Sequence, residues 1–215
     1  MDTLELAYES ELQRGGEFML REASAFFDGG GRLRETLRRL AERLEAEGIA
    51  YALVGGLALA EHGYPRLTEH IDIVLTGAGL AQFTERWLGR GYRPAFEGAR
   101  KSFRDAQTGV RIEILLTGEY PGDGLPKPVA FPDPAFPNAT IEIDGIHVIA
   151  LDRLIEMKLA SGLSAGHRLR DLADVQDLIG RLDLPLELAE RLHPSVVPAY
   201  KELWEQVQAG KAEET

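Results

Sequence analysis

The sequence predicts an α/β protein, with a sheet of about five strands flanked by helices and a helical subdomain at the C-terminus. Two patterns carry this prediction. Between Arg32 and Ile149, short apolar runs of strand length alternate with amphipathic stretches and tight turns. From Leu151 onwards, apolar residues recur at helical spacing only. We therefore expect an N-terminal helical arm over residues 1–30, a core over residues 31–150 and a C-terminal helical subdomain over residues 151–215.

The first part of the chain is expected to be helical. Leu4–Phe27 has apolar residues at helical spacing, interrupted by a glycine pair, and ends at a glycine-rich hinge. Arg32–Glu47 is predicted to be an amphipathic helix, with Gly48 as its C-terminal cap. Its apolar stripe consists of residues three and four apart in the sequence: Leu33, Leu37, Leu40, Ala41 and Leu44.

Short strands and helices alternate in the next part. Tyr51–Val54 is predicted to be a buried strand, followed at once by a glycine pair and a helix of small residues, Leu57–His62. Ile71–Leu75 is a second expected strand, and Leu80–Arg90 an amphipathic helix that ends at a glycine. This order of strand, helix, strand and helix is typical of an α/β core.

Two hairpins and a helical region complete the chain. The first hairpin pairs Ala99–Arg104 with Val110–Leu115, and the second pairs Thr140–Asp144 with Ile146–Ile149. The proline-rich stretch between the hairpins, Pro121–Pro137, is expected to be an irregular loop. The remaining stretches with helical spacing are Leu151–Ser161, Gly166–Ile179, Pro185–Leu192 and Pro198–Gln208.

The composition limits the classes of function. Asp and Glu total 35 against 24 Lys and Arg, and this net charge of −11 argues against binding to long nucleic acids, which depends on neutralising phosphates. Without cysteine, the chain has no disulfide, thiolate metal site or cysteine nucleophile. No apolar run approaches the roughly 18–20 residues that cross a bilayer, and the N-terminus lacks a signal-peptide pattern. We therefore expect a cytoplasmic protein without a membrane partner.

Polar side chains at alternate positions mark the strand Ile71–Leu75 as a candidate site. His70 and Asp72 are two residues apart and should project from the same face, whereas Ile71 faces the other way. Glu113 interrupts an apolar strand that we expect beside Ile71–Leu75. An acid in such a position needs a cation, an arginine or solvent nearby. Two carboxylates converging from adjacent strands suit Mg²⁺, which prefers hard oxygen ligands and triphosphate.

A glycine pair precedes this strand. Gly55 and Gly56 let the backbone approach a ligand closely, and the N-terminus of the helix after them favours phosphate oxygens. Many turns between a strand and a helix use such glycines for packing only. The pair therefore indicates a site through its context, because the polar strand follows it in the sequence.

Together these residues resemble the signature of the polymerase-beta-like nucleotidyltransferase superfamily, whose matching residues here are Gly55-Gly56, His62-Gly63, Arg66, Thr68 and His70-Ile-Asp72. The resemblance implies a mixed, twisted sheet of the nucleotidyltransferase type and a phosphate-binding turn at the glycine pair. It also implies that Asp72 is the second aspartate of an Asp-x-Asp strand and that Glu113 is a third acid. His70 stands where the family places the first aspartate. Arg66 and Thr68 would brace the loop at the nucleotide site.

A second match lies in the C-terminal half. It resembles the Lys…Arg-Asp-x-x-Asp pattern of bacterial nucleotidyltransferase-like proteins, a group that includes the toxins of abortive-infection toxin–antitoxin systems, and it comprises Glu156–Ala160 and Arg168–Val175. The resemblance implies a triphosphate contact for Lys158, for which a snorkelling surface lysine is the alternative. Asp171 would contact the nucleotide or belong to an ion-pair network inside the helical region. Asp174 is expected to be structural.

Whether the site is expected to be active depends on the role of His70. Imidazole is a poor Mg²⁺ ligand and adds no negative charge, so it weakens the carboxylate cluster that two-metal phosphoryl transfer uses. Three roles are therefore open for His70. It marks a site that has lost catalysis, or it ligates a borderline metal such as Mn²⁺ or Zn²⁺. In the third, Asp72 and Glu113 form the site alone and His70 contacts the phosphate or the base. Asp72 has its own alternative, as a structural acid paired with Arg66 or Arg111.

These residues predict one function and two alternatives. As an enzyme, the chain would bind a nucleoside triphosphate with Mg²⁺ or Mn²⁺ on His70, Asp72 and Glu113, and would transfer a nucleotidyl group to an acceptor hydroxyl. Asp72, Glu113 and Lys158 would carry the catalysis, while Asp171 would help to bind the nucleotide. The alternatives are a catalytically degenerate homologue that binds a nucleotide or a protein, and a component of a toxin–antitoxin or other defence system. The acceptor is open among RNA, protein and small molecules such as aminoglycosides, and exchange of the N-terminal arm would give a homo-oligomer.

Overall fold

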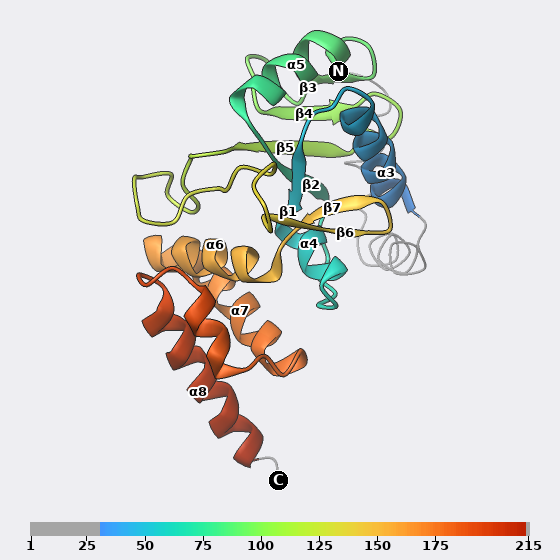
Figure 1. Cartoon of the computed structure of the whole chain (residues 1–215). Coiled ribbons are helices and arrows are strands. Elements are labelled where there is room, and N and C mark those ends of the chain that lie inside the picture. Colours follow the sequence, from blue (N-terminus) through green and yellow to red (C-terminus); the bar gives the residue numbers. More distant parts are fainter. Residues whose placement is uncertain (1–30, 214–215) are drawn as a thin grey trace.

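The structure of the protein is a computed structural model that describes residues 31–213. A mixed, twisted sheet occupies one end of the molecule, and the C-terminal helices extend away from it (Figure 1). In the described part the sheet has seven strands in the order β3-β4-β5-β2-β1-β7-β6. The α/β class is confirmed, although the expectation of about five strands was too low. The helical arm expected at Leu4–Phe27 lies outside the described residues.

Four strands form the centre of the sheet: β1 (Tyr51–Val54), β2 (His70–Leu75), β5 (Arg111–Leu116) and β7 (Ile146–Ile149). β1 runs antiparallel to β2 and parallel to β7, whereas β2 runs parallel to β5. These strands are rich in Val, Ile and Leu because central strands are covered on both faces. The prediction that the strand containing Glu113 lies beside the strand containing Asp72 is confirmed.

Three short strands lie toward the edges: β3 (Tyr92–Pro94), β4 (Ser102–Asp105) and β6 (Thr140–Ile143). β6 forms the expected hairpin with β7, and β4 forms the expected hairpin with β5, although it begins only at Ser102. β3 was not predicted. It has three residues and contains a proline, which a sheet tolerates at an edge, and β3 is the terminal strand on that side.

Three helices pack close to the sheet: α3 (Gly31–Ala46), α4 (Gly55–Glu61) and α5 (Gly77–Trp87). The predicted apolar stripe of α3 is fully buried. The cap after α3 is also as predicted, since Gly48 has a φ of +65° and its N–H donates to the carbonyl of Glu45 at 2.9 Å. α4 begins directly at the end of β1, so the glycine pair is held at the centre of the sheet.

The C-terminal region is helical from Leu151. It contains α6 (Leu151–Ser164), α7 (Leu169–Arg181) and α8 (Val197–Glu213), and α7 packs between α6 and α8 (Figure 1). α6 is buried along Leu154–Gly162, because α7 covers one side and the sheet region lies on the other. None of the helices within residues 31–213 combines the length and apolar composition needed to cross a membrane.

Two helical predictions need correction. The stretch Gly166–Ile179 is two elements, a 3₁₀ turn at Gly166–Arg168 and then α7. The stretch Pro185–Leu192 forms a 3₁₀ helix at Leu186–Arg191 rather than an α-helix. Short helical segments often adopt the tighter 3₁₀ form as connectors, and hydrophobic spacing alone does not distinguish the two forms over so few residues.

Candidate functional site

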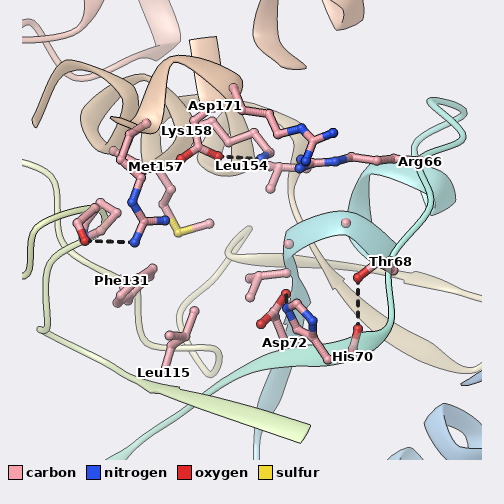
Figure 2. Close-up of a pocket in the computed structure, with 18 of the residues that line it drawn as sticks. Arg66, Thr68, His70, Asp72, Leu115, Phe131, Leu154, Met157, Lys158 and Asp171 are labelled. Carbon is pink, nitrogen blue, oxygen red and sulfur yellow. Dashed lines mark hydrogen bonds and ion pairs between the residues drawn. The ribbon is translucent and has the colours of Figure 1, made fainter. Parts of the chain in front are cut away.

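A cavity of about 700 Å³ lies where the end of β1, β2, the end of β5 and the helices α6 and α7 come together. This volume is within the usual range of small-molecule sites. Figure 2 shows Asp72 and His70 on one side of the cavity, with Lys158 and Asp171 on the opposite side. The sequence-predicted residues that line it are Gly55, Gly56, Arg66, Thr68, His70, Asp72, Lys158 and Asp171. Glu113 is the predicted site residue that does not line it.

Asp72 and Glu113 occupy paired register positions on the parallel strands β2 and β5. Neighbouring strands are separated by about 4.8 Å, so their carboxylates originate close together. Glu113 points to local partners, since its Oε1 accepts from Ser102 Oγ at 2.8 Å and lies 2.9 Å from Arg111 Nε. Arg111 therefore pairs with Glu113, and the alternative that it pairs with Asp72 was wrong.

His70 is the partner of Asp72. Its Nε2 lies 3.2 Å from Asp72 Oδ2, and the two side chains are 34% and 18% exposed. The hydrogen bond to Asp72 raises the pKa of His70 above its ordinary value, against the opposing effects of burial and of the Arg111 charge. The alternative that Asp72 pairs with Arg66 was also wrong, because Arg66 contacts Asp174.

The glycine pair is required by the side chains of β2. Gly55 has a φ of +68°, and a Cβ added to it would lie 2.1 Å from Asp72 Oδ2. A Cβ on Gly56 would lie 2.9 Å from Thr68 Cβ. Only glycine avoids these contacts, so the start of α4 can lie against the polar face of β2. These glycines were expected to let a ligand approach the backbone, and the structure shows that they also make room for the side chains of Asp72 and Thr68.

Lys158 is held inside the helical wall of the cavity. It is only 7% exposed, and its Nζ lies 3.0 Å from Asp171 Oδ1 and 2.7 Å from Asp174 Oδ2. The alternative of a snorkelling lysine is therefore wrong. Asp174 Oδ2 also accepts from Arg66 Nη1, so one buried carboxylate joins α6, α7 and the loop before β2.

Asp171 faces the cavity beside Lys158. Burial alone would raise its pKa, but Lys158, a 2.7 Å hydrogen bond from Ser161 Oγ and the charge of Arg168 together hold the pKa below its ordinary value. Asp171 is consequently ionised near neutral pH. An ion-pair network was expected to join Arg170 with Asp171 and Asp174; these two acids do belong to such a network, but its cations are Lys158 and Arg66. Lys158, Asp171 and Arg66 also line the cavity.

The loop before β2 is fastened at several points. Arg66 contacts Asp174 on α7, and Tyr64 donates its hydroxyl hydrogen to Asp177 Oδ2 at 2.6 Å. Thr68 Oγ1 donates to the carbonyl of His70 at 3.3 Å (Figure 2). These contacts connect the polar end of β2 with α7, so the two sides of the cavity are held by one set of interactions.

Several lining residues were not predicted as site residues. Arg168 and Arg170 place two guanidinium groups at the cavity; both belong to the second sequence match, in which Arg170 was expected only in the ion-pair network of the helix. The apolar lining comes from residues far apart in the sequence, so only the folded chain brings them together. These residues are Leu115, Phe131, Leu154 and Met157 (Figure 2).

The donor groups near β2 fit a divalent cation in part. Asp72 and Glu113 supply carboxylate oxygens, which Mg²⁺ prefers, and His70 supplies an imidazole, which suits Mn²⁺ or Zn²⁺ better. Within residues 31–213, no three His, Cys, Asp or Glu side chains are gathered closely enough to hold a metal ion. The expected ligands His70, Asp72 and Glu113 are therefore not gathered as a three-residue site, and Glu113 would have to exchange its contact with Arg111 to bind a cation beside Asp72.

Comparison with known proteins gives matches among solved structures only. No family model matches the sequence, and no curated protein matches it. A protein from H. pylori provisionally assigned as a nucleotidyltransferase is 14% identical over 94% of this chain and 99% of its own, with a TM-score of 0.48. A similarly assigned protein from Thermotoga maritima is 22% identical over 65% of this chain and 91% of its own, with a TM-score of 0.45.

A third solved structure is that of ANT(2'')-Ia in complex with adenylyl-2''-tobramycin. It is 12% identical over 84% of this chain and 98% of its own, with a TM-score of 0.41. These identities and scores are too low to assign a family or an activity, so the function has to be inferred from the geometry of the site.

Proposed function

We propose that this protein is a nucleotidyltransferase that transfers a nucleotidyl group from a nucleoside triphosphate to an acceptor hydroxyl with the help of Mg²⁺ or Mn²⁺. The observation that carries the proposal is the pairing of Asp72 with Glu113 on adjacent parallel strands, at a cavity whose opposite wall holds Lys158. Of this pair Asp72 lines the cavity and faces the cationic wall, and Glu113 lies beside it on the next strand; this arrangement suits a triphosphate and a divalent cation.

The charges of the helical wall support this proposal. Lys158 and Arg66 are balanced by Asp171 and Asp174, with which they form ion pairs. The further cations at this wall, Arg168 and Arg170, leave an excess of positive charge. A triphosphate entering the cavity would therefore meet a wall with complementary charge.

The proposed reaction is a simple displacement at phosphorus. The acceptor oxygen forms a bond to the α-phosphorus, the bond from that phosphorus to the bridging oxygen breaks, and pyrophosphate leaves while the hydroxyl proton passes to solvent or a nearby base. A divalent cation on Asp72 and Glu113 would neutralise the developing charge. The residues of the chain supply position and charge, with Lys158 held near the phosphates and the turn at Gly55-Gly56 against them.

The proposal is tested by following the α-phosphate. Each of the four nucleoside triphosphates, labelled at that phosphate, is incubated with the full chain, Mg²⁺ or Mn²⁺ and a pool of acceptors that contains RNA, proteins and aminoglycosides. The proposal predicts labelled acceptor and released pyrophosphate, both lost in Asp72→Asn and retained in Glu142→Gln, a change of an exposed residue on β6. It fails if no nucleotide binds and no acceptor is labelled with either metal.

A second candidate function is nucleotide binding without transfer. It is favoured by the contacts of the two acids in the structure. Asp72 is in contact with His70, and Glu113 is in contact with Arg111 and Ser102 rather than with a cation site. Under this alternative the chain would be a degenerate homologue that binds a nucleotide or a partner protein. A role in a toxin–antitoxin or defence system stays a prediction of the sequence resemblance.

The substitution His70→Asp separates the two candidates. If the chain is a degenerate enzyme, a carboxylate at this position should restore metal binding and transfer activity, because it adds the missing charge and a hard oxygen ligand. If the wild-type chain is already active through Asp72 and Glu113, the substitution changes the metal preference toward Mg²⁺. A variant that binds nucleotide but stays inert favours the pure binding role.

A further inference from the structure

One end of the cavity is apolar. Leu115 from β5, Phe131 from the loop that follows it, and Leu154 and Met157 from α6 line this end, which we call the apolar slot (Figure 2). Leu154 and Met157 are 1% and 5% exposed and close the slot on the helical side. Leu115 and Phe131 remain partly exposed and face the cavity. The polar residues around Asp72 and Lys158 adjoin this slot within the same cavity.

The slot offers hydrophobic surface rather than hydrogen-bonding groups. The N–H of Phe131 donates to the carbonyl of Glu119 at 2.8 Å, and the carbonyl of Phe131 accepts from Gly118 at 2.9 Å. Leu115 is paired within the sheet, opposite Val74 of β2. Leu154 and Met157 lie in the helix α6, whose backbone groups bond one another. The backbone groups of Phe131, Leu154 and Met157 are therefore committed to the fold.

The charged side chains next to the slot also form hydrogen bonds and ion pairs within the protein. Both carboxylate oxygens of Glu119 accept from Lys101 Nζ at 2.8 Å. Arg168 Nη2 donates to the carbonyl of Gly122 at 3.3 Å. Tyr120 also lines the cavity and carries a hydroxyl, so Tyr120→Phe serves as the control for hydrogen bonding.

We propose that the apolar slot binds the base of the nucleoside triphosphate, and that it selects purines over pyrimidines by contact area without distinguishing adenine from guanine. This inference rests on the proposed function, because that function places the phosphates beside Lys158, Arg168 and Arg170. A nucleotide has an apolar ring joined to a strongly anionic chain, and the cavity has the same two parts side by side. Stacking and apolar contact depend on ring area, whereas telling adenine from guanine requires hydrogen bonds to the base edge.

The test measures affinity by calorimetry with the full chain in the presence of Mn²⁺. The probes are ATP, GTP, CTP, UTP and inorganic triphosphate, which has no base. We expect ATP and GTP to bind within about 3-fold of each other and about 10-fold more tightly than CTP and UTP, because losing ring contact has an effect of this order. Inorganic triphosphate should bind least tightly, at the level that the cations alone provide.

Two substitutions at one position separate the ring from general apolar packing. Phe131→Leu keeps most of the apolar volume and removes the ring, and Phe131→Ala removes both. Both should bring the affinities of ATP and GTP close to those of CTP and UTP while leaving the affinity for inorganic triphosphate unchanged, which also shows that the variants are folded. Tyr120→Phe should leave the order of the five affinities unchanged.

The outcomes distinguish this inference from the proposed function. If inorganic triphosphate and the four nucleotides bind alike, and Phe131→Leu changes none of them, the phosphate site stands and the slot does not hold the base. A preference for ATP over GTP of about 100-fold would overturn the inference, since it requires hydrogen bonds to the base edge. If no probe binds, the proposed function fails and this inference fails with it.

Discussion

The two walls of the cavity are built in different ways. On the sheet wall, His70 and Asp72 are two residues apart on β2, partly exposed and in contact with each other. On the helical wall, Lys158 is buried and is held by Asp171 and Asp174, which lie on the next helix. The sheet wall is thus set by strand geometry, whereas the helical wall is set by a buried ion-pair network.

Because of this difference, we expect the helical wall to determine mainly the stability of the protein and the sheet wall to determine mainly its activity. Removing a member of the buried network leaves an uncompensated charge inside the protein, which is strongly destabilising. Removing a partly exposed acid from the sheet wall leaves little uncompensated charge, because solvent reaches the site. We therefore expect substitutions on the helical wall to lower the free energy of unfolding, and substitutions on the sheet wall to lower activity.

The largest expected effect is that of Asp174→Ala on stability. Its carboxylate is 3% exposed and accepts from both Lys158 and Arg66, so its loss should lower the free energy of unfolding by about 3–5 kcal/mol, measured by urea denaturation. Asp177→Ala on the same helix is the control. That carboxylate is exposed and accepts from Tyr64, and its removal should cost about 1 kcal/mol or less. Equal losses in the two variants would contradict the contrast between the walls.

The next effect concerns the sheet wall and is measured as activity. Asp72→Asn keeps the size of the side chain and removes the charge, so transfer activity should fall by about 100-fold or more, since charge stabilisation in the site is lost. The free energy of unfolding should change by about 1 kcal/mol or less, because the side chain is 18% exposed. A large loss of stability together with unchanged activity would show that Asp72 is structural.

The glycine at the start of α4 gives a smaller effect with a matched control. Gly55→Ala and Gly48→Ala both place a Cβ at positive φ, +68° and +65°, and each should cost about 1–2 kcal/mol for the backbone. At Gly48 nothing lies within 4 Å of the added atom, whereas at Gly55 it meets Asp72. Gly55→Ala should therefore be the more destabilising of the two in urea denaturation, and it should also weaken nucleotide binding. Equal losses and intact binding would mean that Asp72 moves aside without consequence.

The smallest expected effect is a dependence of stability on pH through Asp171. Its pKa is lowered in the folded protein, so the unfolded chain takes up the proton first as the pH falls below about 4. The stabilisation is present above the unfolded pKa and is lost as the pH falls through the folded pKa. Asp171→Asn should flatten this part of the stability profile measured by urea denaturation. An unchanged slope would show that Asp171 is not held as an ion by Lys158.

Strand periodicity predicted more of the fold than of the site. The bounds of β1 and β7 follow directly from their apolar runs, and the alternation at His70 and Asp72 correctly indicated a polar face. Strand β3 was not predicted, because three residues that include a proline carry no periodic signal. The one-to-one pairing of Asp72 with Glu113 is a matter of register, which the sequence of either strand alone does not contain.

The helical wall was the harder part to predict. A lysine between Met157 and Leu159 reads as a surface residue with a long apolar stem, and its burial depends on how α6 and α7 pack. The contact of Arg66 with Asp174 joins residues far apart in the sequence, as does the apolar slot. Interactions of this kind are fixed by tertiary packing, for which a single sequence offers no pattern.

The assignment of this cavity as a site for a nucleotide and a divalent cation is tested most directly by the dependence of ATP affinity on Mn²⁺, measured by calorimetry. Wild type and Glu142→Gln are predicted to bind ATP about 10-fold or more tightly with Mn²⁺ than without it, since a divalent cation joins the carboxylates to the triphosphate. In the double variant Asp72→Asn with Glu113→Gln this dependence on Mn²⁺ should disappear, while a weak affinity that is due to the cations of the helical wall remains. ATP binding that is independent of Mn²⁺ in wild type, or dependent to the same degree in the double variant, would contradict the assignment of this cavity.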